Sequence, residues 1–106
     1  QIIACVLIVL LAIVVGCVGM YGLSNRTSEA GVKLVAGLLE PLAGQIPGLL
    51  KAQVRPCFQG GMDFCLYSEL ESREALAVYA DHPLHIAAKD QFFHMLAGRV
   101  AIDFEV

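Results

Sequence analysis

The first 25 residues of the chain contain no Asp, Glu, Lys, Arg or His. All seven basic and all ten acidic residues follow from Arg26 onward and leave a mildly acidic balance. Because the basic residues form no cluster, the sequence predicts no nucleic-acid partner. The apolar content is 58%, which exceeds the roughly 45–50% of ordinary globular proteins, and most of this excess lies in the uncharged segment.

Recognisable catalytic and metal-binding motifs are also scarce. The sequence has no phosphate-binding loop, no nucleophile elbow and no CxxC pair. Its four cysteines, Cys5, Cys17, Cys57 and Cys65, are too scattered for a disulfide framework and are expected to be small apolar side chains. Cys57 and Cys65 flank a QGGM turn, so a disulfide across a hairpin is the alternative for that pair. We predict neither a cofactor nor a metal ion.

The apolar segment Gln1 to Leu23 has three interpretations. It is long enough for a membrane-spanning helix, which needs about 20 apolar residues. Its VVGC, ending at Cys17, resembles a bacterial lipoprotein cleavage box. Its many Ile and Val residues suit a buried strand, although a strand uses only about 5–6 residues. The main prediction is a membrane anchor or assembly helix over residues 1–24, and the main alternative is a first strand at about residues 11–20.

Residues 25–106 have the pattern of an α+β domain. Apolar positions at helical spacing predict a helix that Thr27 caps, Pro41 disturbs and Gly44 closes. The segments LLKAQVRPCF and MDFCLYSEL then predict a hairpin around QGG. Pro56 confines the first of these strands to an edge or a bulge.

The rest of the domain is predicted as two helices and a strand. Ser72 caps the first helix, and Pro83 suits the first turn of the second. The closing RVAIDFEV alternates, so we expect a strand that buries Val100, Ile102 and Phe104 on one side. Together with a strand from the apolar segment, the order becomes the βαββαβ of a ferredoxin-like fold.

The segments GQIPGLLKAQV, SELESREALAVYADHPLH and RVAIDFEV resemble the stress-responsive α/β-barrel family, also called Dabb domains. The resemblance covers roughly residues 27–106. It implies a ferredoxin-like domain of the dimeric α/β-barrel type, in which the four-stranded sheets of a homodimer face each other. It also implies a first strand near Leu11 to Met20 that carries a histidine. Ile13 stands at that position here, which favours a changed role for the segment.

The stretch VYADHPLH brings Tyr79, Asp81, His82 and His85 together at a helix break. Imidazole and phenol groups can transfer protons near neutral pH. Polyketide-cyclase-like relatives of this family use a tyrosine and a histidine that match Tyr79 and His85, which makes these two the candidate catalytic residues. The structural alternative is that His82 caps the next helix, Tyr79 packs under the sheet and His85 lies on the surface. A metal site of His82 and His85 with Asp81 or His94 is the weakest hypothesis.

Two functions follow from these interpretations. The main one is a non-enzymatic small subunit whose apolar helix anchors or stabilises a membrane-embedded or filamentous protein assembly, with the Dabb-like domain outside. Its partners would be the other chains of the assembly and the lipid membrane. It would be located in the membrane as a single-pass protein or in an assembled filament. Tyr79 and His85 are then expected not to form a working site. The alternative is a soluble cytoplasmic homodimer that binds a small hydrophobic ligand and acts as a polyketide-cyclase-like enzyme.

Overall fold

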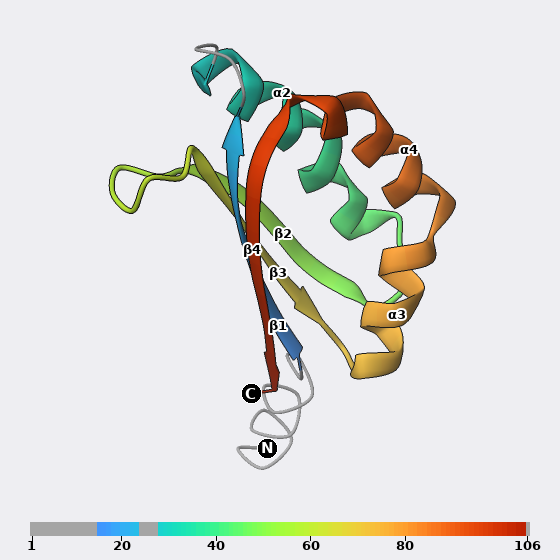
Figure 1. The fold of residues 1–106 in the computed structure, drawn as a ribbon. Helices are drawn as coiled ribbons and strands as arrows, with labels where there is room; N and C mark the ends of the chain where they lie inside the picture. Colours follow the sequence, from blue (N-terminus) through green and yellow to red (C-terminus); the bar gives the residue numbers. More distant parts are fainter. Residues whose placement is uncertain (1–14, 24–27, 106) are drawn as a thin grey trace, which may run out of the picture.

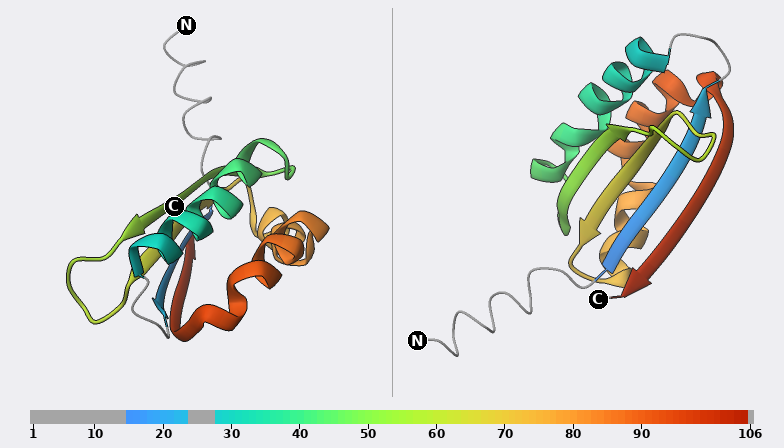
Figure 2. Two further views of the ribbon diagram at one scale, coloured as in Figure 1. Left: turned by 90° about the horizontal axis from the view of Figure 1, so that it is seen from above. Right: turned by 90° about the vertical axis from the view of Figure 1, so that its left-hand side faces the viewer.

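The computed structural model describes residues 15–23 and 28–105. A four-stranded antiparallel sheet forms one layer, and helices cover one of its faces (Figure 1). The strand order is β2-β3-β1-β4, which Figure 2 shows from the side of the sheet that no helix covers. The strands are β1 Val15–Leu23, β2 Leu49–Pro56, β3 Phe64–Leu70 and β4 Leu96–Glu105. The helices are α2 Ser28–Leu39, α3 Arg73–Asp81 and α4 Pro83–Phe92, with 3₁₀ turns η1 Glu40–Gly44 and η2 Phe93–Met95.

Strand β1 corrects the main prediction for the apolar segment. Val15–Leu23 lies inside the sheet, with Val15 opposite Leu70 of β3 and Glu105 of β4. A helix reaching Leu23 is therefore wrong, because all nine residues pair with β4 and those from Val15 to Tyr21 pair with β3 as well. The first-strand alternative was right for the part of residues 11–20 that the structure describes, since the strand there runs over Val15–Leu23. Residues 1–14, Ile13 among them, lie outside the described residues. Within residues 15–23 and 28–105, no helix has the length and apolar character to span a membrane.

The predicted elements after Asn25 are confirmed. The α-helix α2 ends at Leu39, and the chain tightens into the 3₁₀ turn η1 at Pro41, where proline cannot continue an α-helical ladder. Pro56 ends β2, which is an edge strand. The Ser72 hydroxyl caps α3 by accepting a hydrogen bond from a backbone N–H in its first turn. The predicted cap Thr27 lies outside the described residues.

The hydrophobic core lies between the sheet and the helices. Strands β1 and β3 turn alternate side chains toward the helices, as period-two patterning requires. Phe64 is fully buried, and its ring stacks on Tyr21 with centroids 5.0 Å apart. The larger aliphatic core residues are Val15, Val32, Val35, Leu39, Leu42, Ile46, Leu49, Val54, Leu66 and Leu70.

The alternation of β4 is confirmed, but its apolar side is not buried within the chain. Val100, Ile102 and Phe104 are 46%, 56% and 42% exposed. They lie opposite even-numbered residues of β1, such as Val18 opposite Ile102, and so share the sheet face that no helix covers. The predicted burial was wrong because the other side of β4, which carries Arg99, is the one that faces the helices. We call the uncovered side of the sheet the open face.

The hairpin cysteines are free thiols. Cys65 pairs with Arg55 across the β2–β3 hairpin, so Cys57 is its diagonal neighbour and not the directly opposed residue that a disulfide would favour. Cys17 is also free, and Cys5 lies outside the described residues.

Gly48 should tolerate no side chain. Its φ is +84°, and a Cβ there would lie 2.6 Å from the Cβ of Ala75. Gly48→Ala should therefore lower the free energy of unfolding by roughly 1–3 kcal/mol, through left-handed strain and overpacking. The matched control is Gly37→Ala on the exposed side of α2, where a Cβ meets nothing within 4 Å. That change should raise the free energy of unfolding by about 0.5–1 kcal/mol. Urea unfolding of both variants checks the contrast, and equal effects would contradict it.

Candidate functional site

A cavity opens between the helices and the sheet, on the face opposite the open face. It has a volume of about 130 Å³ and adjoins a second cavity of about 170 Å³. Together they lie at the small end of known ligand pockets, which start near ~300 Å³. Five residues line both cavities: Tyr21, Leu66, Ala80, His85 and Arg99. We call the two together the helix-side cavity.

The break between α3 and α4 brings the two predicted catalytic residues together. His82 ends α3 and caps α4, its Nδ1 accepting a hydrogen bond of 3.1 Å from the backbone N–H of Leu84. Pro83 starts α4, where its fixed φ suits the first turn. The rings of Tyr79 and His85 then lie 4.3 Å apart between centroids, tilted by 34°. Both residues line the helix-side cavity, and His85 is half-buried there.

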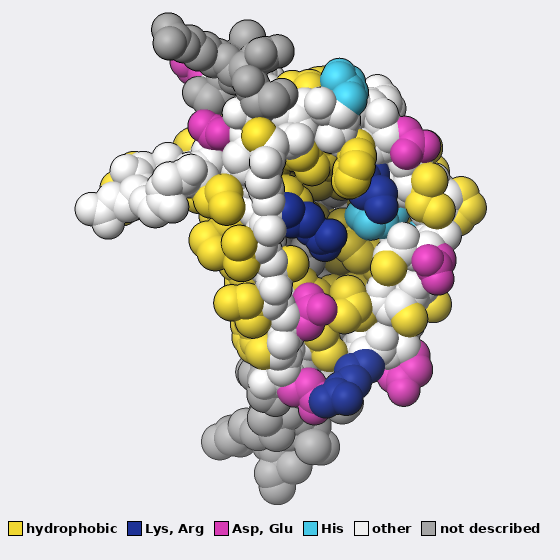
Figure 3. All heavy atoms as spheres, in the orientation of Figure 1, with side chains coloured by type: hydrophobic (Ala, Val, Ile, Leu, Met, Phe, Trp, Pro, Cys, Tyr) yellow, Lys and Arg dark blue, Asp and Glu magenta, His cyan; other side chains and the backbone are white. Residues whose placement is uncertain are grey.

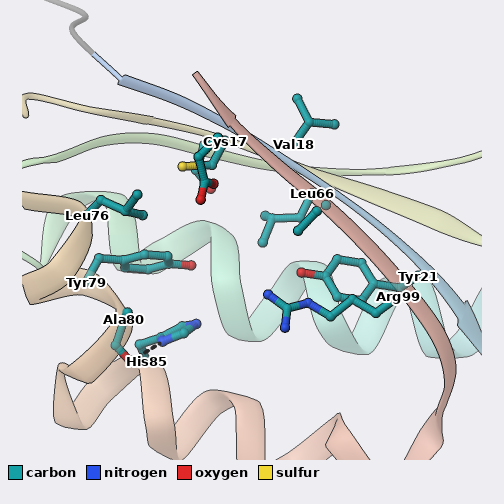
Figure 4. Close-up of a pocket in the computed structure, with 13 residues that line it drawn as sticks. Cys17, Val18, Tyr21, Leu66, Leu76, Tyr79, Ala80, His85 and Arg99 are labelled. Atoms are coloured by element: carbon teal, nitrogen blue, oxygen red, sulfur yellow. Dashed lines mark hydrogen bonds between the residues drawn. The ribbon is translucent and has the colours of Figure 1, made fainter. Parts of the chain in front are cut away.

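His85 presents an unprotonated nitrogen to the cavity. Its Nδ1 lies 3.1 Å from the carbonyl oxygen of Ala80. A carbonyl only accepts, so Nδ1 carries the proton of the neutral ring and Nε2 keeps a lone pair. Figure 4 shows this second nitrogen pointing into the cavity. Burial lowers the pKa of His85 below 6.5, helped by the charges of Lys89 and Arg99 and opposed by the Ala80 hydrogen bond. The ring is therefore neutral at physiological pH.

Tyr79 presents a hydrogen-bond donor beside that base. Its hydroxyl is buried and has no hydrogen-bond partner within the described residues. Burial, then the neighbouring Tyr21 and Cys17, raise the pKa of Tyr79 to about 12. The nearby Ser68 side chain acts to lower the pKa of Tyr79, although the two hydroxyls do not reach hydrogen-bonding geometry. The phenol therefore keeps its proton near neutral pH, and a ligand oxygen would satisfy it.

Two further polar residues complete the site and were missed in the sequence. Arg99 of β4 pairs with Tyr21 of β1, and its guanidinium lies 6.0 Å from the centroid of the Tyr21 ring. Figure 4 shows the polar ends of Tyr21, Tyr79, His85 and Arg99 pointing toward one another from β1, α3, α4 and β4. The only sequence signal was the position of Arg99 on the side of β4 opposite its apolar residues.

Cys17 also lines the cavity but is no nucleophile. Burial, together with a hydrogen bond to Asp103 and its negative charge, raises the pKa of Cys17 to about 12. A thiol with that pKa stays protonated at neutral pH, whereas nucleophilic attack needs the thiolate. The cysteine therefore acts as a small side chain of the cavity wall.

The metal hypothesis is not supported. Within residues 15–23 and 28–105, no three His, Cys, Asp or Glu side chains lie close enough to share a metal ion. His82, the proposed first ligand, already uses Nδ1 to cap α4.

Comparisons with known proteins point to one family. The family model for the Stress Responsive A/B Barrel Domain matches residues 18–106. A dimeric protein of ferredoxin-like fold and unknown function from Bacteroides fragilis is 21% identical, with a TM-score of 0.79 over 88% of this chain and 96% of that one. A dimeric ferredoxin-like protein from Thermobifida fusca is 26% identical, with a TM-score of 0.76 over 89% and 92%. The hydroxynitrile lyase of Passiflora edulis is 11% identical, with a TM-score of 0.76 over 90% and 94%. No curated protein matches.

These findings overturn the anchoring-subunit interpretation. The family match begins at residue 18, inside the segment assigned to the membrane or to an assembly. Nine residues of that segment form an interior strand of the sheet instead. The similar structures named above are two dimeric ferredoxin-like proteins and a lyase.

Proposed function

Since the chain belongs to the stress-responsive α/β-barrel (Dabb) family, we propose that it is a homodimeric barrel protein that binds a small hydrophobic ligand in its helix-side cavity. We further propose that it acts on this ligand by proton transfer, as a polyketide-cyclase-like enzyme. One observation carries the proposal. The lone pair of His85 and the unpartnered hydroxyl of Tyr79 meet in one cavity whose remaining wall is largely apolar.

The two side chains suit carbon acid chemistry. Nε2 of His85 would remove a proton from a carbon next to a ligand carbonyl, and the C–H electron pair would form the enolate. The Tyr79 hydroxyl would donate to the carbonyl oxygen as its negative charge develops. The enolate carbon would then attack a second carbonyl of the same molecule, and protonated His85 would return its proton to the new alkoxide. Such acid–base steps contribute about 10²–10⁴-fold to a rate.

The homodimer is supported by the open face and by the relatives. Val100, Ile102 and Phe104 stay partly exposed beside Val18, and contiguous exposed apolar side chains mark protein–protein interaction sites. Figure 3 shows hydrophobic side chains gathered along the side of β4 that faces away from the helices. The similar proteins from Bacteroides fragilis and Thermobifida fusca are dimeric.

Exchange of carbon-bound protons tests the chemistry without knowledge of the natural substrate. NMR would follow deuterium exchange at the carbons next to the carbonyl of 2-octanone in D₂O. The wild type should accelerate this exchange. The acceleration should be smaller by about 10²-fold or more in His85→Gln, and only partly reduced in Tyr79→Phe. Because the pKa of His85 lies below 6.5, the rate should already be near its plateau at neutral pH and fall as the medium becomes acidic through that lowered pKa.

His94→Gln is the matched control, because His94 is exposed and lines neither cavity. This variant should catalyse the deuterium exchange of 2-octanone at the wild-type rate. Equal rates for the wild type and His85→Gln would refute the catalytic role of His85, and binding of 2-octanone without exchange would leave a ligand-binding protein.

A further inference from the structure

The helix-side cavity is positively charged at one end. Arg99 lines both of its parts, and Lys89, one helical turn after His85, lines the second. Figure 3 shows Lys or Arg side chains together with a His in the hollow between β4 and the helices. Both cations act on His85, since their charges help to lower its pKa.

Neither cation has a carboxylate partner in the part of the chain that the structure describes. The ion pairs found there join Lys33 to Glu29, Arg55 to Glu40 and Arg73 to Glu105. The nearest acid on the same side of β4 is Asp103, four residues from Arg99 and hence about 13 Å along the strand. It lies at the other end of the first cavity, against Cys17. Arg99 is instead placed over the ring of Tyr21.

The cavity wall beside these cations is apolar. In the second cavity Leu39, Leu66, Phe92 and Leu96 supply it. A guanidinium at an apolar wall recognises carboxylates well, because its planar N–H groups match the two oxygens. The site therefore combines a charged end, an apolar wall and the Tyr79–His85 pair.

We propose that the ligand is a small amphipathic carboxylate, with its carboxylate on Arg99 and Lys89 and its hydrocarbon part along the apolar wall. This inference rests on the ligand cavity of the proposed function and adds the charge of the ligand. It makes a hydrophobic oxo acid the substrate class, with the reacting carbon held near Nε2 of His85. Arg99 is then the residue that selects the acid over neutral ketones and amides.

A pair of probes that differ in charge tests the proposal on the full chain. Titration calorimetry at pH 7.5 would compare octanoate with octanamide, which have the same chain length. The wild type should bind octanoate about tenfold more tightly than octanamide. This preference should shrink with added salt, because the charges of Arg99 and Lys89 are accessible to solvent. Arg99→Gln should remove the preference by weakening octanoate alone, and Arg99→Lys should retain part of it.

Arg55→Gln is the matched control, since Arg55 is paired with Glu40 and lines neither cavity. It should keep the wild-type preference. Equal binding of both probes, unchanged by Arg99→Gln, would overturn the inference and leave the hydrophobic cavity standing. Failure of the folded wild type to bind either probe would count against the cavity, and with it the proposed function.

Discussion

Replacing Phe64 by alanine should lower the free energy of unfolding by about 3–5 kcal/mol, because the change leaves a cavity in the centre of the core. The Phe64 side chain is fully buried. Its ring stacks on Tyr21, so the loss also removes an aromatic pair. A domain of this size is stable by only about 5–15 kcal/mol, so the variant should unfold at much lower urea concentration.

Phe58 is the control for this measurement. It lies in the loop between β2 and β3, and its side chain is 94% exposed. Phe58→Ala removes the same group without opening a cavity and should change stability by less than about 0.5 kcal/mol. A loss below about 1 kcal/mol for Phe64→Ala would mean that the ring does not hold β3 against the helices.

The sequence predicted the fold after Asn25 well because local rules govern it. Strand β3 alternates strictly, since one side of it faces the helices and the other the open face. Proline and serine sit where elements start or stop, as at Pro41 and Ser72. None of these features depends on a distant part of the chain.

The first strand was only the alternative prediction because it has no polar side. In β1 even the open-face positions are apolar or glycine, with Val18 and Met20 beside the exposed apolar residues of β4. A strand covered on both faces is a continuous apolar run, and hydrophobicity alone does not distinguish it from a membrane helix. The missing information was the pairing with β3 and β4, which no local pattern contains.

In the candidate site, too, local sequence indicates some residues and only the tertiary pairing reveals the others. Tyr79 and His85 lie close in sequence around a proline, so a motif could indicate them. Arg99 joins them only through the register of β4 on β1, which places it opposite Tyr21. A one-residue slip would turn Arg99 to the open face. Its role therefore could not be predicted before the register was known.

Ile102→Asp should convert the proposed homodimer to a folded monomer. Ile102 is 56% exposed on the open face, and its backbone pairs with Val18 in the middle of β1. A stable interface must cover about 600–1,000 Å² of each partner. The β1–β4 half of the open face carries the exposed apolar residues that such an interface would bury. An unpaired carboxylate buried there costs about 3–5 kcal/mol, which corresponds to a dimer roughly 10²–10⁴-fold weaker.

Sedimentation over a range of concentrations measures this change, with circular dichroism to confirm that the variant is folded. The control is Ile86→Asp, which places the same charge on α4, where Ile86 is 41% exposed. It should leave the dimer intact. A wild-type monomer, or an Ile102→Asp dimer of unchanged affinity, would refute the interface.

The same variant separates assembly from ligand binding. The helix-side cavity is lined by residues of this one chain and lies on the other side of the sheet from Ile102. A folded Ile102→Asp monomer should therefore still bind octanoate, with an affinity reduced only as far as the sheet loosens. Loss of octanoate binding together with the dimer would show that the second copy holds the cavity in shape. In that case β4 links the dimer interface to the cavity. This strand carries Arg99 on the side of the cavity and the exposed apolar residues on the side of the interface.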